Sequence, residues 1–173
     1  MGITKMDKLY SKEIMKHFQR PRNIGKMKNF DGLGKVGNLL CGDILWLYLK
    51  IGKNKQGKEI IKKASFSTFG CTVAIANSSL ITTMVKGKTL KEAMKITKDE
   101  LLKRLGKVPP FKMHCSLLAV DALSEAIYDY LARNKKKIPK ELQKRHQRIE
   151  KEKKEMEKRY KEWIKIEEEM YQK

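Results

Sequence analysis

The chain has 173 residues, enough for one domain with a buried core and an appended element. It carries 40 Lys and Arg against 20 Asp and Glu, a formal net charge of +20. No run of residues resembles a membrane span or a secretory signal, so we expect a cytoplasmic protein without membrane attachment. Its basic residues are scattered and, near the C-terminus, interleaved with acids. This pattern argues against nucleic acid as the main partner.

The first half of the chain predicts one helix and a pair of strands. Ser11 is placed to cap a helix over residues 11–19. Residues 43–51 alternate as a buried strand, and residues 60–69 return after a turn as its antiparallel partner. On the first strand, one face collects four apolar residues, Leu45, Leu47, Leu49 and Ile51. We expect this face to lie against the core.

The second half predicts helices. One runs over residues 72–86, and capping boxes at Thr89 and Thr97 start two short ones. The two prolines of the segment VPPF, residues 108–111, predict an extended loop before a last helix over 115–133. Because strands precede most of the helices, the fold class is α+β, with a small antiparallel sheet packed against several helices.

The tail, residues 134–173, is predicted to be distinct from the domain formed by residues 1–133. A lysine-rich linker with Pro139 precedes one long charged helix from Lys140 onward. Apolar residues recur in it every seven positions, at Leu142, Ile149, Met156, Trp163 and Met170. Because the second apolar position of a coiled-coil heptad is mostly charged, we expect a solvated helix or one docked along a thin stripe.

Three cysteines, Cys41, Cys71 and Cys115, each lie at a junction between elements. Cys71 and Cys115 start predicted helices, where the helix dipole favours a thiolate. Thiolates are nucleophiles and soft metal ligands, so these positions suit sulfur chemistry or metal binding. Spacing alone leaves a second interpretation open, in which the cysteines are small buried apolar residues.

Four segments around these cysteines resemble, in the same order, the IscU/NifU-type iron–sulfur cluster assembly scaffolds. They lie within residues 8–131 and are YSKEIMKHFQRPRNIG, VGNLLCGD, FSTFGCTVAIANSSL followed by MVKGK, and VPPFKMHCSLLAVDAL. The resemblance implies an IscU-like fold and a carrier without enzymatic activity. Such a scaffold assembles a labile [2Fe-2S] cluster from iron and desulfurase-derived sulfur and transfers it to apo-proteins.

The same resemblance implies the residues of the site. Cys41, Cys71 and Cys115 would hold the cluster, with Asp43 or His114 as the fourth ligand. A carboxylate or an imidazole in the fourth place makes a weaker, exchangeable site than four thiolates. Cys115 is the predicted acceptor of persulfide sulfur from a cysteine desulfurase.

Further partners follow from the resemblance. The segment VPPFK resembles the stretch that an Hsp70 and J-protein chaperone pair recognises in these scaffolds; it comprises Val108, Pro109, Pro110, Phe111 and Lys112. Apo iron–sulfur proteins would accept the cluster. We expect the protein to be a monomer or a weak homo-oligomer.

An alternative function is a SufU-type zinc-dependent sulfurtransferase that accepts persulfide sulfur from a desulfurase. In this case Cys41, Cys71, Cys115 and Asp43 would hold Zn²⁺, which could also occupy the isolated protein. His114 and the short interval between the second and third cysteines favour the scaffold, because SufU-type proteins lack that histidine and carry an insertion in that interval.

Two other histidines are not assigned to the site. His17 lies on the first helix and is expected at the surface or hydrogen-bonded in the core. His146 lies in the charged tail and is expected to be solvated.

Overall fold

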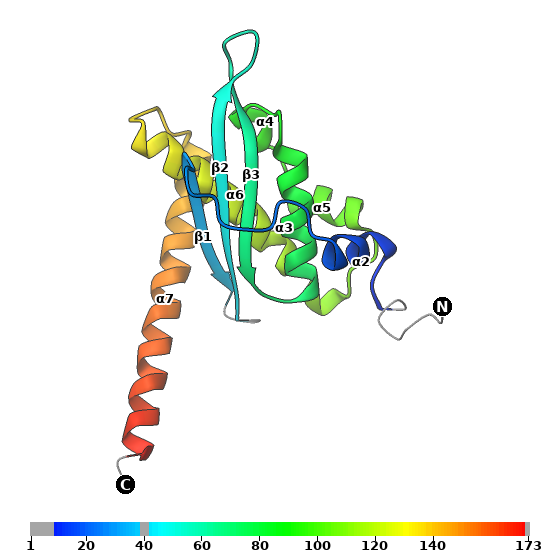
Figure 1. Cartoon of the computed structure of the whole chain (residues 1–173). Helices are drawn as coiled ribbons and strands as arrows, with labels where there is room; N and C mark the ends of the chain where they lie inside the picture. The colour runs from blue at the N-terminus through cyan, green and yellow to red at the C-terminus, as the bar shows by residue number, and fades with distance from the viewer. Residues whose placement is uncertain (1–8, 39–41, 172–173) are drawn as a thin grey trace.

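The computed structural model describes residues 9–38 and 42–171, and describes side chains for residues 9–37 and 42–162 (Figure 1). Its elements in chain order are α2 (Lys12–Gln19), β1 (Gly32–Asn38), β2 (Asp43–Lys53), β3 (Glu59–Phe69), α3 (Thr72–Val85), α4 (Leu90–Ala93), α5 (Lys98–Leu105), the 3₁₀ turn η1 (Pro110–Lys112), α6 (Cys115–Arg133) and α7 (Lys140–Tyr171). The predicted α+β class and the predicted strand pair are confirmed.

The sheet has three antiparallel strands in the order β1-β2-β3. On the central strand β2, Leu45, Leu47 and Leu49 are each at most 1% exposed, as their alternation predicts. A register shift between Lys50 and Ile51 ends this regular pattern. The burial of one face explains why the register is well defined, since a slip by one residue would turn the three leucines away from the core.

Strand β1 is an element that the sequence did not predict. It contains three glycines, and glycine weakens the strand signal because it has no side chain to pack. The structure shows their purpose, since a Cβ at Gly34 would lie 1.9 Å from the Ala122 carbonyl oxygen and one at Gly32 would lie 2.2 Å from that of Ala126. Helix α6 therefore packs its backbone directly against β1.

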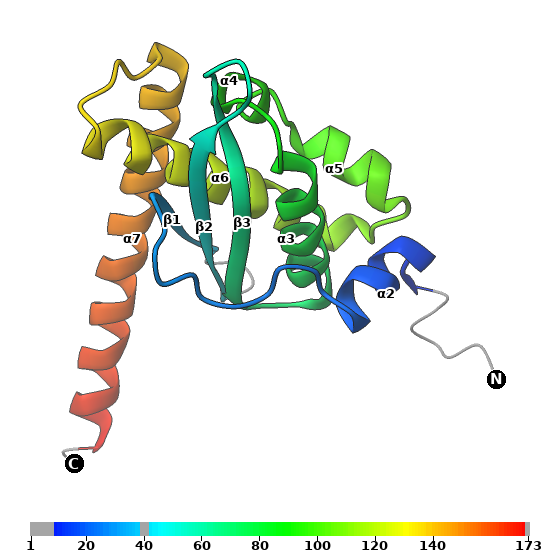
Figure 2. The ribbon, with the colours of Figure 1, turned by 45° about the horizontal axis from the view of Figure 1, so that its top comes forward.

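Helices α3 and α6 lie on one face of the sheet, and the segment between α2 and β1 crosses the other face (Figures 1 and 2). The predicted N-caps are present, but of the predicted capping box at Thr97 the structure shows only the half in which the Glu100 N–H donates to Thr97 Oγ1. Ser11 Oγ accepts a hydrogen bond from the Ile14 N–H, and Thr89 forms both halves of a capping box with Glu92. His17 is hydrogen-bonded in the core, with its Nδ1 2.8 Å from Ser79 Oγ.

Helix α7 crosses α6 and packs against it in its first half, and it extends beyond the end of the sheet in its second half (Figures 1 and 2). Leu142 and Ile149, which are 4% and 5% exposed, form the docked stripe. At the edge of the sheet, the Met156 methyl group packs so close to Gly37 that a Cβ there would lie 2.7 Å from it. The predicted long helix is confirmed, and of the two alternatives, a solvated helix or one docked along a thin stripe, the structure shows docking in the first half of α7.

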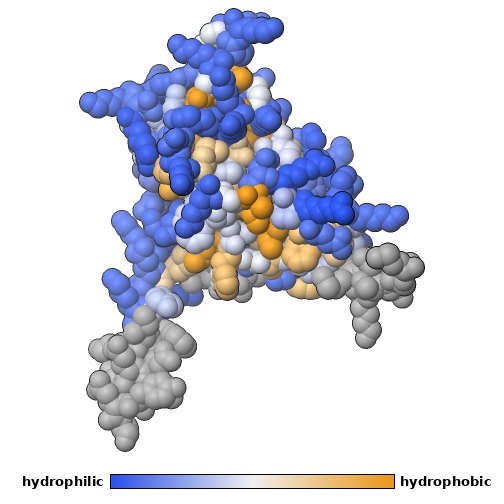
Figure 3. Space-filling view, viewed as in Figure 1, coloured by the Kyte–Doolittle hydropathy of each residue, from blue (hydrophilic) through white to orange (hydrophobic). Residues whose placement is uncertain are grey.

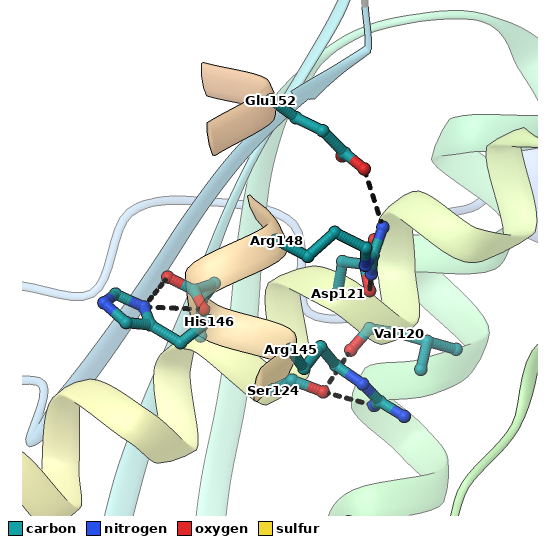
Figure 4. Close-up of polar contacts among 8 residues, drawn as sticks. Val120, Asp121, Ser124, Arg145, His146, Arg148 and Glu152 are labelled. Carbon is teal, nitrogen blue, oxygen red and sulfur yellow. Dashed lines mark hydrogen bonds and ion pairs between the residues drawn. The ribbon is translucent and has the colours of Figure 1, made fainter. Parts of the chain in front are cut away.

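Three polar contacts flank this stripe and tie α7 to α6 (Figure 4). The shortest separations are 2.7 Å from Arg148 Nη2 to Asp121 Oδ1, 2.6 Å from Arg145 Nη1 to Ser124 Oγ, and 2.9 Å from His146 Nδ1 to Glu125 Oε2. The expectation that His146 is solvated is therefore wrong. Its ring also stacks on Tyr128, with ring centroids 3.7 Å apart. These partners could not be predicted from the charged pattern of the tail, because they belong to α6.

Within residues 9–38 and 42–171, no helix combines the length and the hydropathy that crossing a membrane requires.

Candidate metal centre

Three segments remote in sequence meet at one end of the sheet. Because β2 and β3 are antiparallel, the start of β2 lies beside the end of β3, with Ile44 opposite Phe69. Asp43 is the first residue of β2, and Cys71 is the residue that caps α3, just after β3. Cys115 is the first residue of α6, which packs on both α3 and the sheet. The fold thus brings a carboxylate and two thiols together.

These three side chains lie in mutual contact. The Sγ atoms of Cys71 and Cys115 are 3.5 Å apart, and Cys115 Sγ is 3.7 Å from Asp43 Oδ2. The backbone N–H of Cys71 donates to Asp43 Oδ1 at 3.2 Å, which fixes the carboxylate. One ligand atom from each residue lies within 4.8 Å of the other two. The group is therefore compact enough to bind a single metal ion.

The spacing can be compared with tetrahedral coordination. Two sulfurs at 2.3 Å from one metal ion lie about 3.8 Å apart, and a sulfur and a carboxylate oxygen lie about 3.6 Å apart. The observed separations of 3.5 Å and 3.7 Å agree with these values. The donor set of thiolates and carboxylate suits both iron and zinc. The residues present therefore fit a metal without a large rearrangement.

Burial differs within the group. Cys115 is 0% exposed and Asp43 is 3% exposed, whereas Cys71 is half-buried. Gly70 allows this packing, because a Cβ at that position would lie 3.2 Å from the Asp43 carboxyl carbon. In this conformation Cys71 is the more accessible of the two thiols.

The thiol of Cys71 has a lowered pKa. The hydrogen bond with the Cys115 thiol and the N–H groups of Ala74 and Val73 lower the pKa of Cys71 from 9.0 to about 6. Burial and the nearby Asp43 carboxylate oppose this shift. At neutral pH Cys71 is therefore mostly a thiolate, as expected for a cysteine at a helix N-terminus.

Two other predicted ligands are placed differently. Cys41 lies outside the described residues, two positions before Asp43. His114 is half-buried and directly precedes α6, but it does not belong to the compact group that the described side chains form. Of the two candidates for the fourth ligand, the structure brings Asp43 to Cys71 and Cys115.

The segment Val108–Lys112 is only partly extended. Pro109 has extended backbone angles, but residues Pro110–Lys112 form a 3₁₀ turn that leads toward α6. The prediction of an extended loop is therefore wrong for its second half. Proline fixes φ near −65°, a value that suits the first position of a helical turn as well as an extended chain.

Exposed apolar side chains flank the site, and the sequence reasoning did not identify them as a group. They are Phe69, Phe111, Met113 and Leu117, with exposures of 78%, 63%, 46% and 39%. Figure 3 shows apolar residues gathered at this end of the molecule on an otherwise hydrophilic surface. Phe69, Met113 and Leu117 each lie two positions from Cys71 or Cys115. A patch of this kind is typical of a surface that contacts other proteins.

A second group of possible ligands, Glu125, His146 and Glu150, lies between α6 and α7. It differs from the first in having no thiol. His146 is hydrogen-bonded to Glu125, and Glu150 pairs with Lys153 at 3.3 Å. These contacts account for the group as part of the attachment of α7.

Comparison with known proteins gives consistent matches. The family model of the NifU-like N-terminal domain matches residues 9–137. The iron-sulfur cluster assembly scaffold protein IscU 1 of Archaeoglobus fulgidus is 50% identical over 128 residues, which cover 74% of this chain and 80% of that protein. The scaffold protein IscU of Rickettsia prowazekii is 45% identical over 131 residues, 74% of this chain and 96% of that protein. The iron-sulfur cluster assembly enzyme IscU of Drosophila melanogaster is 44% identical over 133 residues, 75% of this chain and 83% of that protein.

Solved structures support the fold. A nitrogen-fixing NifU-like protein (N-terminal) from Brucella abortus superposes with a TM-score of 0.58 at 21% identity, covering 75% of this chain and 99% of that one. A scaffold protein for the SUF system from Fervidobacterium islandicum gives a TM-score of 0.55 at 24% identity, covering 70% and 98%. At these identities the likeness concerns the fold alone.

Proposed function

The chain belongs to the family of NifU-like N-terminal domains, and we propose that it is an IscU-type scaffold on which iron–sulfur clusters are assembled for transfer to other proteins. The relatives named as IscU scaffolds match the chain over about three quarters of its length. The observation that carries the proposal is the compact group of Asp43, Cys71 and Cys115 at one end of the sheet. In this role the protein is a carrier and not an enzyme.

The site residues have different roles in binding a cluster. Cys71 supplies a thiolate near neutral pH, and Cys115 and Asp43 are held within 3.7 Å of each other by the fold. We propose Cys41 as the third thiolate, because it lies two residues before Asp43 in the chain. The cluster is proposed to be [2Fe-2S]. A carboxylate ligand exchanges more readily than a thiolate, so Asp43 would ease release of the cargo.

Sulfur and partners would arrive at the same end of the molecule. A cysteine desulfurase would deliver persulfide sulfur, and Cys115 is the proposed acceptor. Since Cys115 is buried in this conformation, delivery to it requires the site to open, whereas Cys71 is already accessible. The exposed apolar side chains around the site would contact the desulfurase and the acceptor proteins.

Other parts of the proposal rest on the sequence. An Hsp70 and J-protein pair would bind Val108–Lys112, where Phe111 is 63% exposed and therefore accessible. A cytoplasmic location and a monomeric or weakly associated state also remain predictions.

The function is tested by anaerobic reconstitution with ferrous iron, cysteine, a catalytic amount of cysteine desulfurase and dithiothreitol, which supplies the electrons that reduce persulfide sulfur to sulfide. We expect near-stoichiometric iron and acid-labile sulfide that move to an apo-ferredoxin. Cys71→Ser should lose most of the bound iron and sulfide. Tightly bound zinc without a cluster, together with faster turnover of the desulfurase, would instead establish the zinc-dependent sulfurtransferase.

If Asp43 is the exchangeable ligand, its replacement should change the transfer of the cluster more than its formation. Asp43→Ala should still form a cluster, but the half-time of transfer to apo-ferredoxin should change several-fold because the exchangeable ligand is gone. Asp99→Ala removes an exposed acid from α5 and is the matched control. A transfer half-time equal to that of the control would show that Asp43 is not a ligand of the cluster.

A further inference from the structure

A pocket of about 410 Å³ lies between α7, α6 and the residues in and after α4. Its lining residues are Lys91, Met94, Lys95, Ser124, Pro139, Glu141, Leu142 and Arg145. Half of them come from residues 139–145, which follow the segment matched by the family model, residues 9–137. The docking of α7 therefore creates the pocket. Its volume lies within the range of roughly 300–1,000 Å³ that is usual for small-molecule sites.

The lining combines an apolar part with positive charge. Met94, Pro139 and Leu142 supply the apolar part, and Leu142 is 4% exposed. Lys91, Lys95 and Arg145 supply three positive charges against the single carboxylate of Glu141, a local excess of two. Pockets in which a few polar groups surround an apolar lining bind ligands with an apolar body and one polar group that fixes the orientation.

The surroundings of Arg145 indicate that the ligand of this pocket is an anion. The other two side chains of α7 that contact α6 through polar atoms, His146 and Arg148, meet carboxylates, whereas Arg145 donates to the neutral hydroxyl of Ser124 (Figure 4). Among the described side chains, no carboxylate lies within 4.0 Å of the charged groups of Arg145, Lys91 or Lys95. A half-buried guanidinium forms its strongest hydrogen bonds with an anionic acceptor. The cationic donors of the pocket are therefore not in direct contact with a carboxylate of the described residues, and Asp121 attracts Arg145 only from a longer distance.

We propose that this pocket binds a small amphipathic carboxylate, with its apolar chain on Met94 and Leu142 and its carboxylate between Arg145 and the two lysines. A ligand in this position contacts both α7 and the segment after α4. Because it binds only when α7 is docked, it stabilises the docked helix by mass action. The site is independent of the cysteines and of the assembly of clusters.

The test uses octanoate as the probe and the full-length apo-protein with ¹³C-methyl-labelled methionine. Nuclear magnetic resonance of the methyl groups should show a saturable shift of Met94, with a Kd of about 1 mM or tighter for a ligand of this size. Met156, at the other end of the docked stripe, should not follow the same curve. The uncharged analogue 1-octanol should bind at least about tenfold more weakly, because it lacks the carboxylate.

Variants separate charge from packing. Arg145→Gln should weaken octanoate binding at least about tenfold, because an amide can bond Ser124 but carries no charge. The double variant Lys91→Gln/Lys95→Gln changes exposed side chains outside the docked stripe, so it tests the charge even if Arg145→Gln loosens α7. Lys103→Gln, an exposed lysine of α5, is the matched control and should bind as the unmodified protein does. An unshifted Met94, equal binding of octanol, or full affinity in both charge variants would overturn the proposal.

Discussion

The two longest helices are attached to the domain by different means. In α6, 14 of the 19 residues are buried, and its backbone lies against the glycines of β1. Among the described side chains of α7, only Leu142 and Ile149 are buried, and polar pairs to α6 provide much of the remaining contact. Helix α6 is part of the core and carries a site residue at its first position. Helix α7 follows the segment that the family model matches, and its first residues line one side of the pocket.

The end of the family match falls between these two helices. A helix packed by its backbone cannot be removed or shifted without loss of the core, since interiors are packed to high density. A helix held by one stripe and a few charged side chains buries less apolar surface, so its loss should cost the rest of the fold less. The match to the NifU-like domain includes all of α6 and stops at residue 137, before α7 begins.

The largest loss of stability is expected from a substitution that disrupts the backbone contact between β1 and α6. Gly34→Ala places a Cβ 1.9 Å from the Ala122 carbonyl oxygen, and backbone cannot move aside as a side chain can. We expect the free energy of unfolding to fall by about 3 kcal/mol or more, measured by urea denaturation.

Gly37→Ala is the matched variant for α7. The new Cβ would meet the flexible end of Met156 at 2.7 Å, so the expected loss is about 1 kcal/mol or less. Equal losses in the two variants would contradict the distinction between the helices.

An intermediate effect breaks the attachment of α7. Arg148→Ala removes the partner of Asp121, whose carboxylate is buried, while the Arg148 side chain is 40% exposed. Loss of one member of a fully buried pair costs about 3–5 kcal/mol, and the exposure of Arg148 reduces our expectation to about 1–2 kcal/mol. In a background that carries Asp121→Asn, the loss should shrink by about half, because no buried charge is left without its partner.

The stability loss caused by Arg148→Ala should depend on pH, because it involves the charge of Asp121. Burial raises the pKa of Asp121 above 3.8, so the folded state disfavours its charged form. The loss caused by Arg148→Ala should be complete at neutral pH. It should diminish as the pH falls through the raised pKa of folded Asp121, because below that pH the carboxyl is neutral and no longer needs a cationic partner. A loss that does not depend on pH would mean that packing, and not charge, holds Arg148.

The smallest expected effect is a shift in the titration of the Cys71 thiol in the candidate metal centre. Alkylation of Cys71 by iodoacetamide should have its midpoint near pH 6, and Cys115→Ala should raise this midpoint because the thiol donor is lost. Since the folded pKa is depressed, the contribution of Cys71 to stability is complete above pH 9.0 and is lost as the pH falls to about 6. Arg148→Ala should leave the midpoint unchanged. A shift in that variant would mean that α7 also influences the site.

How far the site could be predicted differs from residue to residue. The largest cause of the lowered pKa of Cys71 is the hydrogen bond with Cys115, which only the tertiary structure provides, whereas the smaller contribution of the helix N-terminus is recognisable in the sequence. The choice between Asp43 and His114 is not recognisable there, because it depends on which side chain the sheet register directs toward the two thiols. The pocket at Arg145 was also unpredictable, since its walls lie some fifty residues apart in the chain.

The sequence by itself determined the local features of this protein. The N-caps at Ser11, Thr89 and Thr97, the alternation of β2 and the start of the apolar stripe of the tail, Leu142 and Ile149, depend on neighbours a few positions away, and they are present as predicted. Two further predicted members of the stripe, Trp163 and Met170, lie outside the described side chains. Two features depended on the tertiary structure. Strand β1 contains glycines because the backbone of α6 packs against them, and His146 is held by partners that belong to another helix. The physical reason is that close packing and the pairing of buried polar groups join residues far apart in the chain, where no local pattern records them.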